Sequence, residues 1–285
     1  MRLVRCANRF LLYLDMGGDT LSKIRVAVSG AAGKMGQEVV RALTREPDME
    51  LVAAFDPKAA GKDAGEVAGI GALGVTIAVD PAAGLGQAQV LVDFTEPAVV
   101  KKNIHTALDQ GVRPVVGTTG MSMEDLADVR RWVKNTGLGA IIAPNFAIGA
   151  ILLMQFAKVA SRYFPHAEII ELHHNQKKDA PSGTAIKTAQ MMAAARGQVA
   201  NEDPSEEKLC GVRGGQLEGI NIHSVRLPGL IAHQEVIFGG SGQILTLRHD
   251  STSRESFMPG VMLAVRKVLE LDELVYGLEN LLFAD

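Results

Sequence analysis

The segment from Glu171 to Ala185, ELHHNQKKDAPSGTA, gathers side chains that can move a proton or hold an anion. His173 and His174 stand side by side, and Lys177 follows four residues after the first of them. Imidazole titrates close to neutral pH, whereas an ammonium group keeps its charge there. Such a set suits a small molecule with more than one carboxylate, and a histidine or the lysine can also transfer a proton to it.

Ser182, Gly183 and Thr184 end this segment at the predicted start of a helix, SGTAIKTAQMMAAAR. The first N–H groups of a helix have no partner within it, and with two hydroxyl groups beside them they form an anion site. The glycine lets a carboxylate come close to the backbone. A salt-bridged surface loop is the alternative interpretation, but it would need neither the glycine nor the hydroxyls, so we favour a ligand site.

The residues before this segment predict how the histidines are presented. AEIIELHH, residues 167–174, is typical of a strand, in which successive side chains alternate between faces. Leu172 and His174 then share one face, and Glu171 and His173 share the other. The two histidines therefore cannot both belong to one packed face. No H-E-x-x-H motif and no cysteine pair accompanies them, so we expect no metal site.

A glycine-rich turn predicts a second site, for a dinucleotide. GAAGKMG follows the strand-like run IRVAVS and opens a helix-like run, where glycines let backbone N–H groups approach a pyrophosphate. An acid at the end of the second predicted strand can accept hydrogen bonds from an adenosine ribose, which favours a cofactor over a turn that serves packing alone. The predicted contacts are Gly30, Ala31, Ala32, Gly33, Lys34, Met35, Gly36 and the acid Asp56.

Two later loops follow predicted strands at the edge where open α/β sheets bind ligands. We expect them to line the nicotinamide, although turns that only cap the next helix would look the same. Their residues are Gly117, Thr118, Thr119, Ala143, Pro144, Asn145 and Phe146. Asp56 favours NADH, whereas Lys58 can reach the extra phosphate of NADPH. We expect NADH as the cofactor, with NADPH also usable.

Strand-like and helix-like runs alternate from Ile24 to about Asn145. Apolar strands in this order predict a parallel sheet with helices on both faces, a Rossmann-type dinucleotide-binding domain of the α/β class. Beyond it, several strands with few helices predict an α+β domain with an open, mostly antiparallel sheet. The expected boundaries are residues 23–146 and 254–285 for the first domain and 147–253 for the second.

The whole chain has 285 residues, a net charge of −3 and a pI near 6.2, without the basic character of a nucleic-acid-binding protein. No apolar run is long enough to predict a membrane span. The two cysteines form no disulfide framework, which favours a reducing cytoplasm. Residues 1–22 place three arginines before a short apolar run, and we interpret them as a disordered extension or an early start rather than a targeting peptide.

Several of these strings together resemble one known family. GAAGKMG, DFT, VVGTTG, PNFAIG and above all ELHHNQKKDAPSGT are similar to motifs of the 4-hydroxy-tetrahydrodipicolinate reductases, long called dihydrodipicolinate reductases. The likeness runs from about Ile24 to the C-terminus. It implies a homotetramer that uses NADH or NADPH to reduce 4-hydroxy-tetrahydrodipicolinate to tetrahydrodipicolinate, in the diaminopimelate route to lysine. It also implies that the second domain is an α+β substrate domain with an open mixed sheet and that it mediates tetramerisation.

The resemblance further implies residue roles. His173 would act as proton donor and acceptor and Lys177 as proton donor, which leaves open which of them delivers the proton. His174 and the Gly183–Thr184 pair would bind the carboxylates of a small cyclic substrate. The glycine turn, Asp56 and the two later loops would hold the cofactor.

Three positions depart from the motifs of some family members. Gln176 stands in place of a third histidine, Pro57 in place of an arginine after the ribose acid, and Glu96 in place of an arginine after DFT. The second departure weakens the case for NADPH. Two rival functions stay open: a similar reductase acting on a different acid, and a non-catalytic dinucleotide sensor. A sensor would have no use for the cluster around His173 and Lys177.

Overall fold

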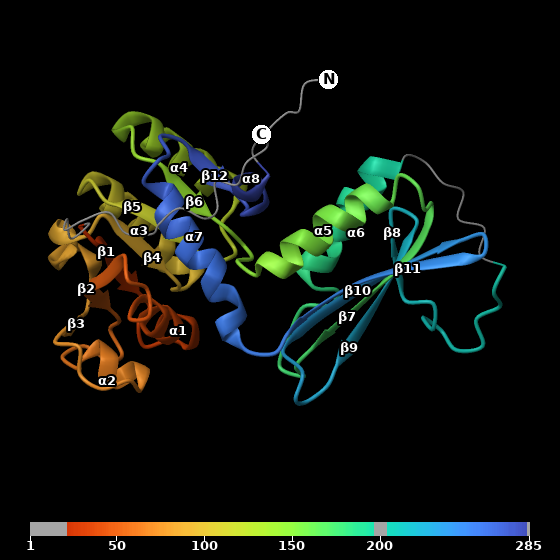
Figure 1. Ribbon diagram of the computed structural model, residues 1–285, viewed down its shortest axis with the longest axis horizontal. Coiled ribbons are helices and arrows are strands. Elements are labelled where there is room, and N and C mark those ends of the chain that lie inside the picture. The colour runs from red at the N-terminus through yellow and green to blue at the C-terminus, as the bar shows by residue number, and fades with distance from the viewer. Residues whose placement is uncertain (1–21, 197–203, 284–285) are drawn as a thin grey trace, which may run out of the picture.

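The computed structural model describes residues 22–196 and 204–283, which form two lobes built on two separate β-sheets (Figure 1). Residues 1–21, nearly all of the predicted N-terminal extension, lie outside the described residues. The chain builds most of the first lobe, then the second, and then returns to the first, where the blue C-terminal helices lie beside the red and yellow strands. The chain therefore crosses between the lobes twice.

The first lobe contains a seven-stranded sheet in the order β12-β6-β5-β4-β1-β2-β3, and every neighbouring pair is parallel. The strands are β1 (Ile24–Ser29), β2 (Met49–Phe55), β3 (Ile77–Ala78), β4 (Val90–Asp93), β5 (Arg113–Val116), β6 (Ala140–Ile142) and β12 (Leu274–Tyr276). With helices on both faces, this order confirms the predicted Rossmann-type fold.

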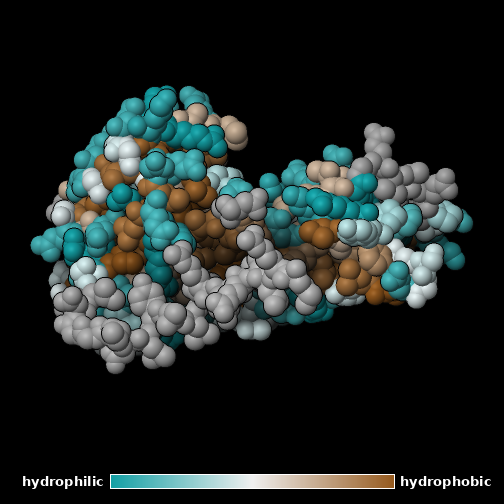
Figure 2. Space-filling model, turned by 45° about the horizontal axis from the view of Figure 1, so that its top comes forward, coloured by the Kyte–Doolittle hydropathy of each residue, from teal (hydrophilic) through white to brown (hydrophobic). Residues whose placement is uncertain are grey.

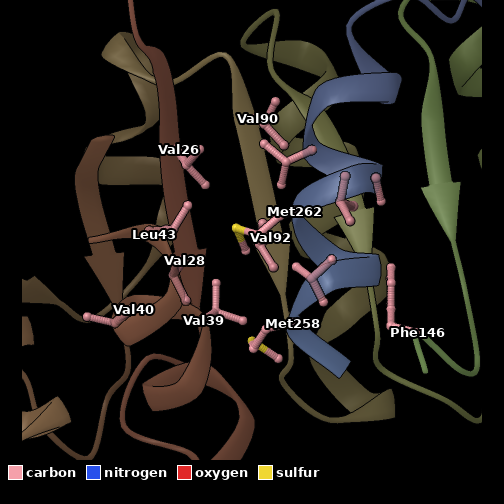
Figure 3. Packing of buried hydrophobic residues seen from close by; sticks show 14 of the residues in the cluster. Val26, Val28, Val39, Val40, Leu43, Val90, Val92, Phe146, Met258 and Met262 are labelled. Carbon is pink, nitrogen blue, oxygen red and sulfur yellow. The ribbon is translucent and has the colours of Figure 1, made fainter. Parts of the chain in front are cut away.

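Helices cover both faces because each strand turns alternate apolar side chains to opposite sides. The helices are α1 (Lys34–Leu43), α2 (Ala64–Ala68), α3 (Pro97–Asp109), α4 (Met123–Thr136), α7 (Met258–Val268) and α8 (Glu279–Leu282). Val26 and Val28 of β1 pack in one cluster with α1 and α7, whereas Ala27 packs in another cluster with residues of α3. Figure 3 shows the first cluster, with Met258 and Met262 of α7 beside the valines of β1 and β4.

The strand order reverses between β1 and β4, since the chain extends the sheet to β2 and β3 on one side and to β5 and β6 on the other. Open α/β sheets bind ligands outside the carboxyl ends of the strands at such a reversal. Gly30 follows β1 and Phe94 follows β4, and a Cβ atom at Gly30 would lie 2.5 Å from the Phe94 carbonyl oxygen. The two loops therefore touch where the fold predicts a ligand crevice.

The second lobe contains a five-stranded sheet in the order β11-β10-β7-β9-β8, in which all pairs are antiparallel except β7 with β9. The strands are β7 (His166–His173), β8 (Gly215–Leu217), β9 (Ile220–Arg226), β10 (Ala232–Gly240) and β11 (Gln243–Ser251). Helices α5 (Ile148–Ala160) and α6 (Gly183–Arg196) lie side by side over one face of this sheet (Figure 1) and share a core with β7, β9 and β10. The predicted open mixed sheet is confirmed.

Local sequence signals explain where some helices begin and end, but they do not reveal the shortest helices and strands. Ser122 caps α4 and forms a capping box with Asp125, and Gly137 ends the helix in the left-handed conformation. The elements α2, β8, β12 and α8 have only three to five residues each, too few for a readable period. Three short 3₁₀ turns are η1 (Pro81–Ala83), η2 (Leu85–Gln87) and η3 (Arg254–Phe257).

Substitution of Gly36 by alanine should destabilise the first lobe. A Cβ atom at Gly36 would lie 2.0 Å from the backbone oxygen of Gly30, and backbone cannot rotate away as a side chain can. We expect the free energy of unfolding to fall by about 1–3 kcal/mol. The melting temperature should then fall by roughly 3–10 °C in thermal unfolding followed by circular dichroism.

Gly86→Ala in η2 is the matched control, because no atom lies within 4 Å of a Cβ placed there. Its melting temperature should stay within about 2 °C of the wild-type value. A Gly36→Ala protein as stable as this control would show that the glycine turn does not limit the packing of α1.

Candidate active site

Backbone hydrogen bonds hold the glycine turn against the end of β2. The N–H groups of Gly30 and Ala31 donate to the Phe55 carbonyl at 2.9 and 3.1 Å, and the N–H of Gly33 donates to the Gly30 carbonyl at 2.9 Å. Ala31 and Gly36 are buried, whereas Gly33 is exposed. The predicted turn therefore has a packed side and an open side, and the open side faces outward at the start of α1.

Helix α1 begins with free donors. Gly33 is its N-cap and supplies no side-chain acceptor. Of the residues that the structure describes, none accepts a hydrogen bond from the backbone N–H of Lys34, Met35 or Gly36. Three free donors at the positive end of a helix attract an anion. This arrangement suits a pyrophosphate.

Asp56 follows β2 and is only 8% exposed. One carboxylate oxygen accepts the N–H of Ala32 at 3.0 Å, and the other accepts the N–H of Lys58 at 2.9 Å. The side chain thus ties the glycine turn to the loop after β2, a contact that the sequence did not predict. Because a carboxylate offers about four acceptor positions, it can still receive a ribose hydroxyl.

A cavity of about 600 Å³ runs beside these loops and the end of β4. Gly30 and Asp56 lie in its wall together with two lysines, Lys58 and Lys102. Lys102 pairs with Asp80, also in the wall, at 2.7 Å. The wall ends at Gly33, directly before the free amides of α1. A carboxylate and lysines in the wall, with free amides next to it, fit the ribose and the phosphates of a nicotinamide dinucleotide.

A fully buried carboxylate, Asp93, organises the loops after β4 and β5. It accepts hydrogen bonds from the hydroxyls of Thr95 at 2.6 Å and Thr118 at 2.9 Å, and from the amide of Asn103 at 2.8 Å. The Thr118 hydroxyl is therefore directed into the protein. Only its backbone and the exposed Thr119 are available to a ligand.

Ring packing positions the loop after β6. The Phe94 and Phe146 rings lie 5.9 Å apart, and a Cβ atom at Gly117 would lie 2.0 Å from the Phe94 ring. In that loop the buried members are Ala143 and Phe146, and the exposed member is Pro144. The side chains of Ala143 and Phe146 thus serve packing, and a cofactor would meet the backbone of this loop or Asn145.

Asn145 connects this loop to the second lobe. Its Nδ2 donates to the hydroxyl of Thr184 at 3.4 Å, and its Oδ1 accepts the N–H of Ala147 at 2.8 Å. Thr184 belongs to the first turn of α6. The loop predicted to line the nicotinamide and the helix start predicted to hold a carboxylate are therefore in contact.

His173 ends β7, and its Nδ1 lies 2.5 Å from a carboxylate oxygen of Glu171. Glu171 has no exposed surface and also receives two hydrogen bonds from Arg226 of β9, at 2.7 and 3.0 Å. Burial alone would raise the pKa of Glu171, but hydrogen bonds from His173, Arg226 and Ser224 outweigh it and lower the pKa to about 2. An ionised carboxylate only accepts, so Nδ1 of His173 carries a hydrogen and Nε2 stays available.

Lys177 lies in the turn of residues 174–179, which we call the lysine turn. Its N–H donates to the His174 carbonyl at 3.1 Å, and its Nζ pairs with both carboxylate oxygens of Asp179 at 2.8 and 2.9 Å. The hydrogen bond from Lys177 lowers the pKa of Asp179. His174 accepts the N–H of Gln176 at its own Nδ1, at 3.2 Å. The sequence predicted a positive charge here, and the structure shows in addition that the ammonium group is paired with Asp179.

The start of α6 is partly occupied and partly open. Ser182 is buried, its N–H donates to Glu171 at 3.3 Å, and its hydroxyl accepts the N–H of Ala185 at 3.2 Å. Within the described part of the chain, the N–H groups of Gly183 and Thr184 have no acceptor, and open space lies beside Gly183. Two free amides therefore remain at the start of α6, where an anion site was predicted.

These groups meet at a small cleft of about 40 Å³ between the lobes. Its wall includes Asn145, His173, Ser182, Thr184, Gln234, His233 and His249. Figure 2 shows the surface hollowed between the lobes, with hydrophobic surface beside the hollow on the larger lobe. The structure therefore brings four of the predicted residues into one cleft, whereas Lys177, His174 and Gly183 lie outside its wall.

Three residues of this region were not predicted from the sequence. His249 packs against Gly149, where a Cβ atom would come within 2.4 Å of its ring, and burial lowers the pKa of His249. His233 pairs through Nδ1 with Asp250 at 2.7 Å. Arg226 lies 55 residues after its partner Glu171. Pairs so far apart in the sequence cannot be predicted from local patterns. For Arg226, the alternation of side chains along the strand NIHSVRL indicates only which face of the sheet it occupies.

Two negative findings concern residues 22–196 and 204–283 alone. No group of three or more histidine, cysteine, aspartate or glutamate side chains there is placed to hold a metal ion. Among the helices of the same ranges, none has the length and apolar character needed to cross a membrane.

Two family models match the chain. The model for the N-terminus of dihydrodipicolinate reductase matches residues 24–146, and the model for its C-terminus matches residues 149–282. A relative named 4-hydroxy-tetrahydrodipicolinate reductase from Desulfitobacterium hafniense is 56% identical over 92% of this chain and 100% of its own. Another of that name, from Moorella thermoacetica, is 52% identical over 92% of this chain and 99% of its own.

Solved structures agree with these matches. A dipicolinate-bound dihydrodipicolinate reductase from Paenisporosarcina sp. TG-14 is 48% identical, with a TM-score of 0.80 over 90% of this chain and 99% of that one. An amine dehydrogenase from Mycobacterium smegmatis shares the fold alone, at 14% identity and a TM-score of 0.64 over 90% of this chain and 96% of that one. Matched through both lobes by models and relatives alike, the chain belongs to the dihydrodipicolinate reductase family.

Proposed function

We propose that the chain reduces 4-hydroxy-tetrahydrodipicolinate to tetrahydrodipicolinate with NADH or NADPH, in the diaminopimelate route to lysine. Relatives at 52% and 56% identity carry the name of this reductase. The observation that carries the proposal is the cleft between the lobes, where His173 of the second sheet and Asn145 of the loop after β6 line one space. A side chain able to transfer a proton thereby lies next to the loop that we predict to approach the nicotinamide.

The substrate class is a small ring with two carboxylates. The free amides of Gly183 and Thr184 suit one carboxylate, and the ammonium group of Lys177 suits the other. The solved relative described as dipicolinate-bound supports this assignment, because dipicolinate is a ring with two carboxylates. In our proposal the substrate displaces Asp179 from Lys177, and His174 assists in binding from the same turn.

The cofactor supplies a hydride when it is bound. The free N–H groups at the start of α1 would bind its pyrophosphate, and Asp56 would accept hydrogen bonds from its adenosine ribose. Asp56 favours NADH, whereas Lys58 in the same wall allows NADPH. The loops at Gly117–Thr119 and 143–146 would approach the nicotinamide mainly with backbone groups.

The ring first loses water. It then receives a hydride from the nicotinamide on one carbon and a proton on the carbon next to it. Nε2 of His173 is the atom left free to supply or relay this proton, since Nδ1 is engaged by Glu171. Lys177 neutralises carboxylate charge and is the second candidate donor. Closure of the lobes over the cleft would exclude water before hydride transfer.

We also propose the division into a cofactor-binding domain, residues 23–146 and 254–285, and a substrate and tetramerisation domain, residues 147–253. It is supported by the two sheets, because all strands of the second lie between residues 166 and 251. A homotetramer in the cytoplasm stays a prediction, and light scattering after size-exclusion chromatography would test the assembly.

His173→Gln and Lys177→Ala should both lower turnover. Loss of a general acid or base typically costs 10²- to 10⁴-fold, so we expect kcat to fall roughly 100-fold or more for His173→Gln. Lys177→Ala should also raise KM for the substrate, because the substitution removes a binding charge. The measurement is the decrease of NADH absorbance after addition of freshly prepared substrate.

His166→Gln on the exposed start of β7 and Lys187→Ala on the exposed side of α6 are matched controls, and both should keep near wild-type rates. Wild-type turnover in both test variants would remove the assignment of these residues. A wild-type protein that binds NADH without oxidising it would be the sensor, and oxidation with another acid alone would favour the rival reductase.

Lys58→Ala should change the choice of cofactor. The side chain lies in the wall of the cavity beside Asp56, where it can meet a 2′-phosphate but has no such partner on NADH. We expect KM for NADPH to rise roughly threefold to tenfold, as for the loss of about 1 kcal/mol of charge-assisted binding, with KM for NADH unchanged. The exposed Lys62, outside this wall, is the control position for Lys62→Ala. Equal effects on both cofactors would contradict a phosphate role for Lys58.

A further inference from the structure

Strand pairing brings three side chains together on the face of the second sheet that α6 covers. In the parallel pair of β7 and β9, His173 lies opposite Arg226 and Glu171 lies opposite Ser224. Side chains two apart on a strand share a face, so Glu171 stands between His173 and Arg226. Its carboxylate contacts His173 with one oxygen and Arg226 with both. The pairing therefore fixes the order histidine, carboxylate, guanidinium.

Arg226 also reaches the lysine turn. Its Nη2 donates to Glu171 at 2.7 Å and to the backbone carbonyl of Asp179 at 2.8 Å. The side chain of Asp179 in turn pairs with Lys177. One guanidinium group is thus bonded both to the carboxylate behind His173 and to the backbone of the turn that carries Lys177.

We propose that Glu171, held in place by Arg226, is a positioning residue that fixes His173 with Nδ1–H turned inward and Nε2 turned to the cleft. The inference rests on the proposed function, since it concerns how His173 would transfer its proton. Neither Glu171 nor Arg226 lines the cleft, so both act through His173 and the lysine turn rather than on the substrate. The other neutral tautomer would turn the lone pair of Nδ1 toward the Glu171 carboxylate, where two acceptors would face each other. Glu171 therefore keeps the hydrogen on Nδ1, and Nε2 is left at the cleft as the atom that takes up a proton and passes it on.

Glu171 is the anion that contacts His173 directly. The groups that face His173 are Glu171 on its own strand, Arg226 on β9, and the cleft histidines His233 and His249 on β10 and β11. Of these groups, Glu171 alone is a carboxylate, so it is the acceptor that orients the ring.

Glu171→Gln tests the proposal, because glutamine keeps the shape and removes the charge. We expect kcat to fall about 10- to 100-fold, part of the contribution of one acid–base group. KM for the substrate should stay within about threefold of the wild-type value, because Glu171 does not line the cleft. The dissociation constant for NADH, measured by fluorescence titration, should stay within twofold and shows that the protein is folded.

Glu168→Gln is the matched control. Glu168 lies on the same strand but faces the other side of the sheet, where it pairs with His223 at 2.7 Å and with Arg213. It is therefore a second glutamate held by a histidine and an arginine, without a link to the cleft. Its kcat and KM should remain those of the wild type.

Glu171→Gln leaves a buried arginine without its counter-charge, so a second variant removes both charges. The double variant Glu171→Gln with Arg226→Met should show the same loss of kcat. Recovery of wild-type kcat in the double variant would mean that Glu171 only neutralises Arg226, and would overturn the proposal. Wild-type behaviour of Glu171→Gln itself would overturn it as well.

A cycle with His173→Gln separates this inference from the function on which it rests. If Glu171 acts through His173, adding Glu171→Gln to His173→Gln should change kcat by less than about twofold. Additive losses of kcat would overturn the positioning role of Glu171 but would leave the proton-transfer role of His173 in place. Wild-type turnover in His173→Gln alone would instead remove the proposed function.

Discussion

The burial of one negative charge constrains much of the second lobe. Glu171 has no exposed surface, and a buried carboxylate is costly unless partners surround it. Arg226, His173 and the N–H of Ser182 supply those partners from β9, from the end of β7 and from the residue before α6. Because removal of one member of a buried ion pair typically costs about 3–5 kcal/mol, these three elements keep their relative positions while the charge stays inside.

Carboxylates hold the loops of the first lobe in the same manner. Asp56 ties the glycine turn to the loop after β2, and Asp93 ties the loops after β4 and β5. These carboxylates hold loops of the scaffold, although Asp56 keeps room to accept a ribose hydroxyl. The free donors described above are amides at the starts of α1 and α6. Both ligands expected here, a dinucleotide and a dicarboxylate, are anions that such amides bind well. In both lobes of this reductase, carboxylates therefore hold the scaffold and amides at helix starts remain free for a ligand.

The sequence predicted the parallel sheet, the mixed sheet and the grouping of His173, Ser182 and Thr184 because local patterns carry that information. Apolar alternation marks strands, and Ser182 sits where a helix-like run begins. Arg226, His233 and His249 were not predicted, because their contacts depend on strand register across many residues of sequence. The ion pair of Lys177 was missed for a different reason. Sequence shows which residues are charged, but whether two neighbours in a turn meet depends on backbone geometry.

The pairing of Lys177 with Asp179 means that the resting protein already contains a bound anion. The Asp179 carboxylate is tethered two residues from Lys177, so it would compete with any ligand carboxylate that approaches this ammonium group. For so short a tether, the effective concentration of the Asp179 carboxylate is roughly millimolar or above. A ligand with a single carboxylate gains little by the exchange, since it replaces one ion pair with another. A ligand whose second carboxylate also occupies the amides of Gly183 and Thr184 gains contacts that Asp179 does not provide. Selection between mono- and dicarboxylates would then arise from competition with Asp179 rather than from the size of the cleft.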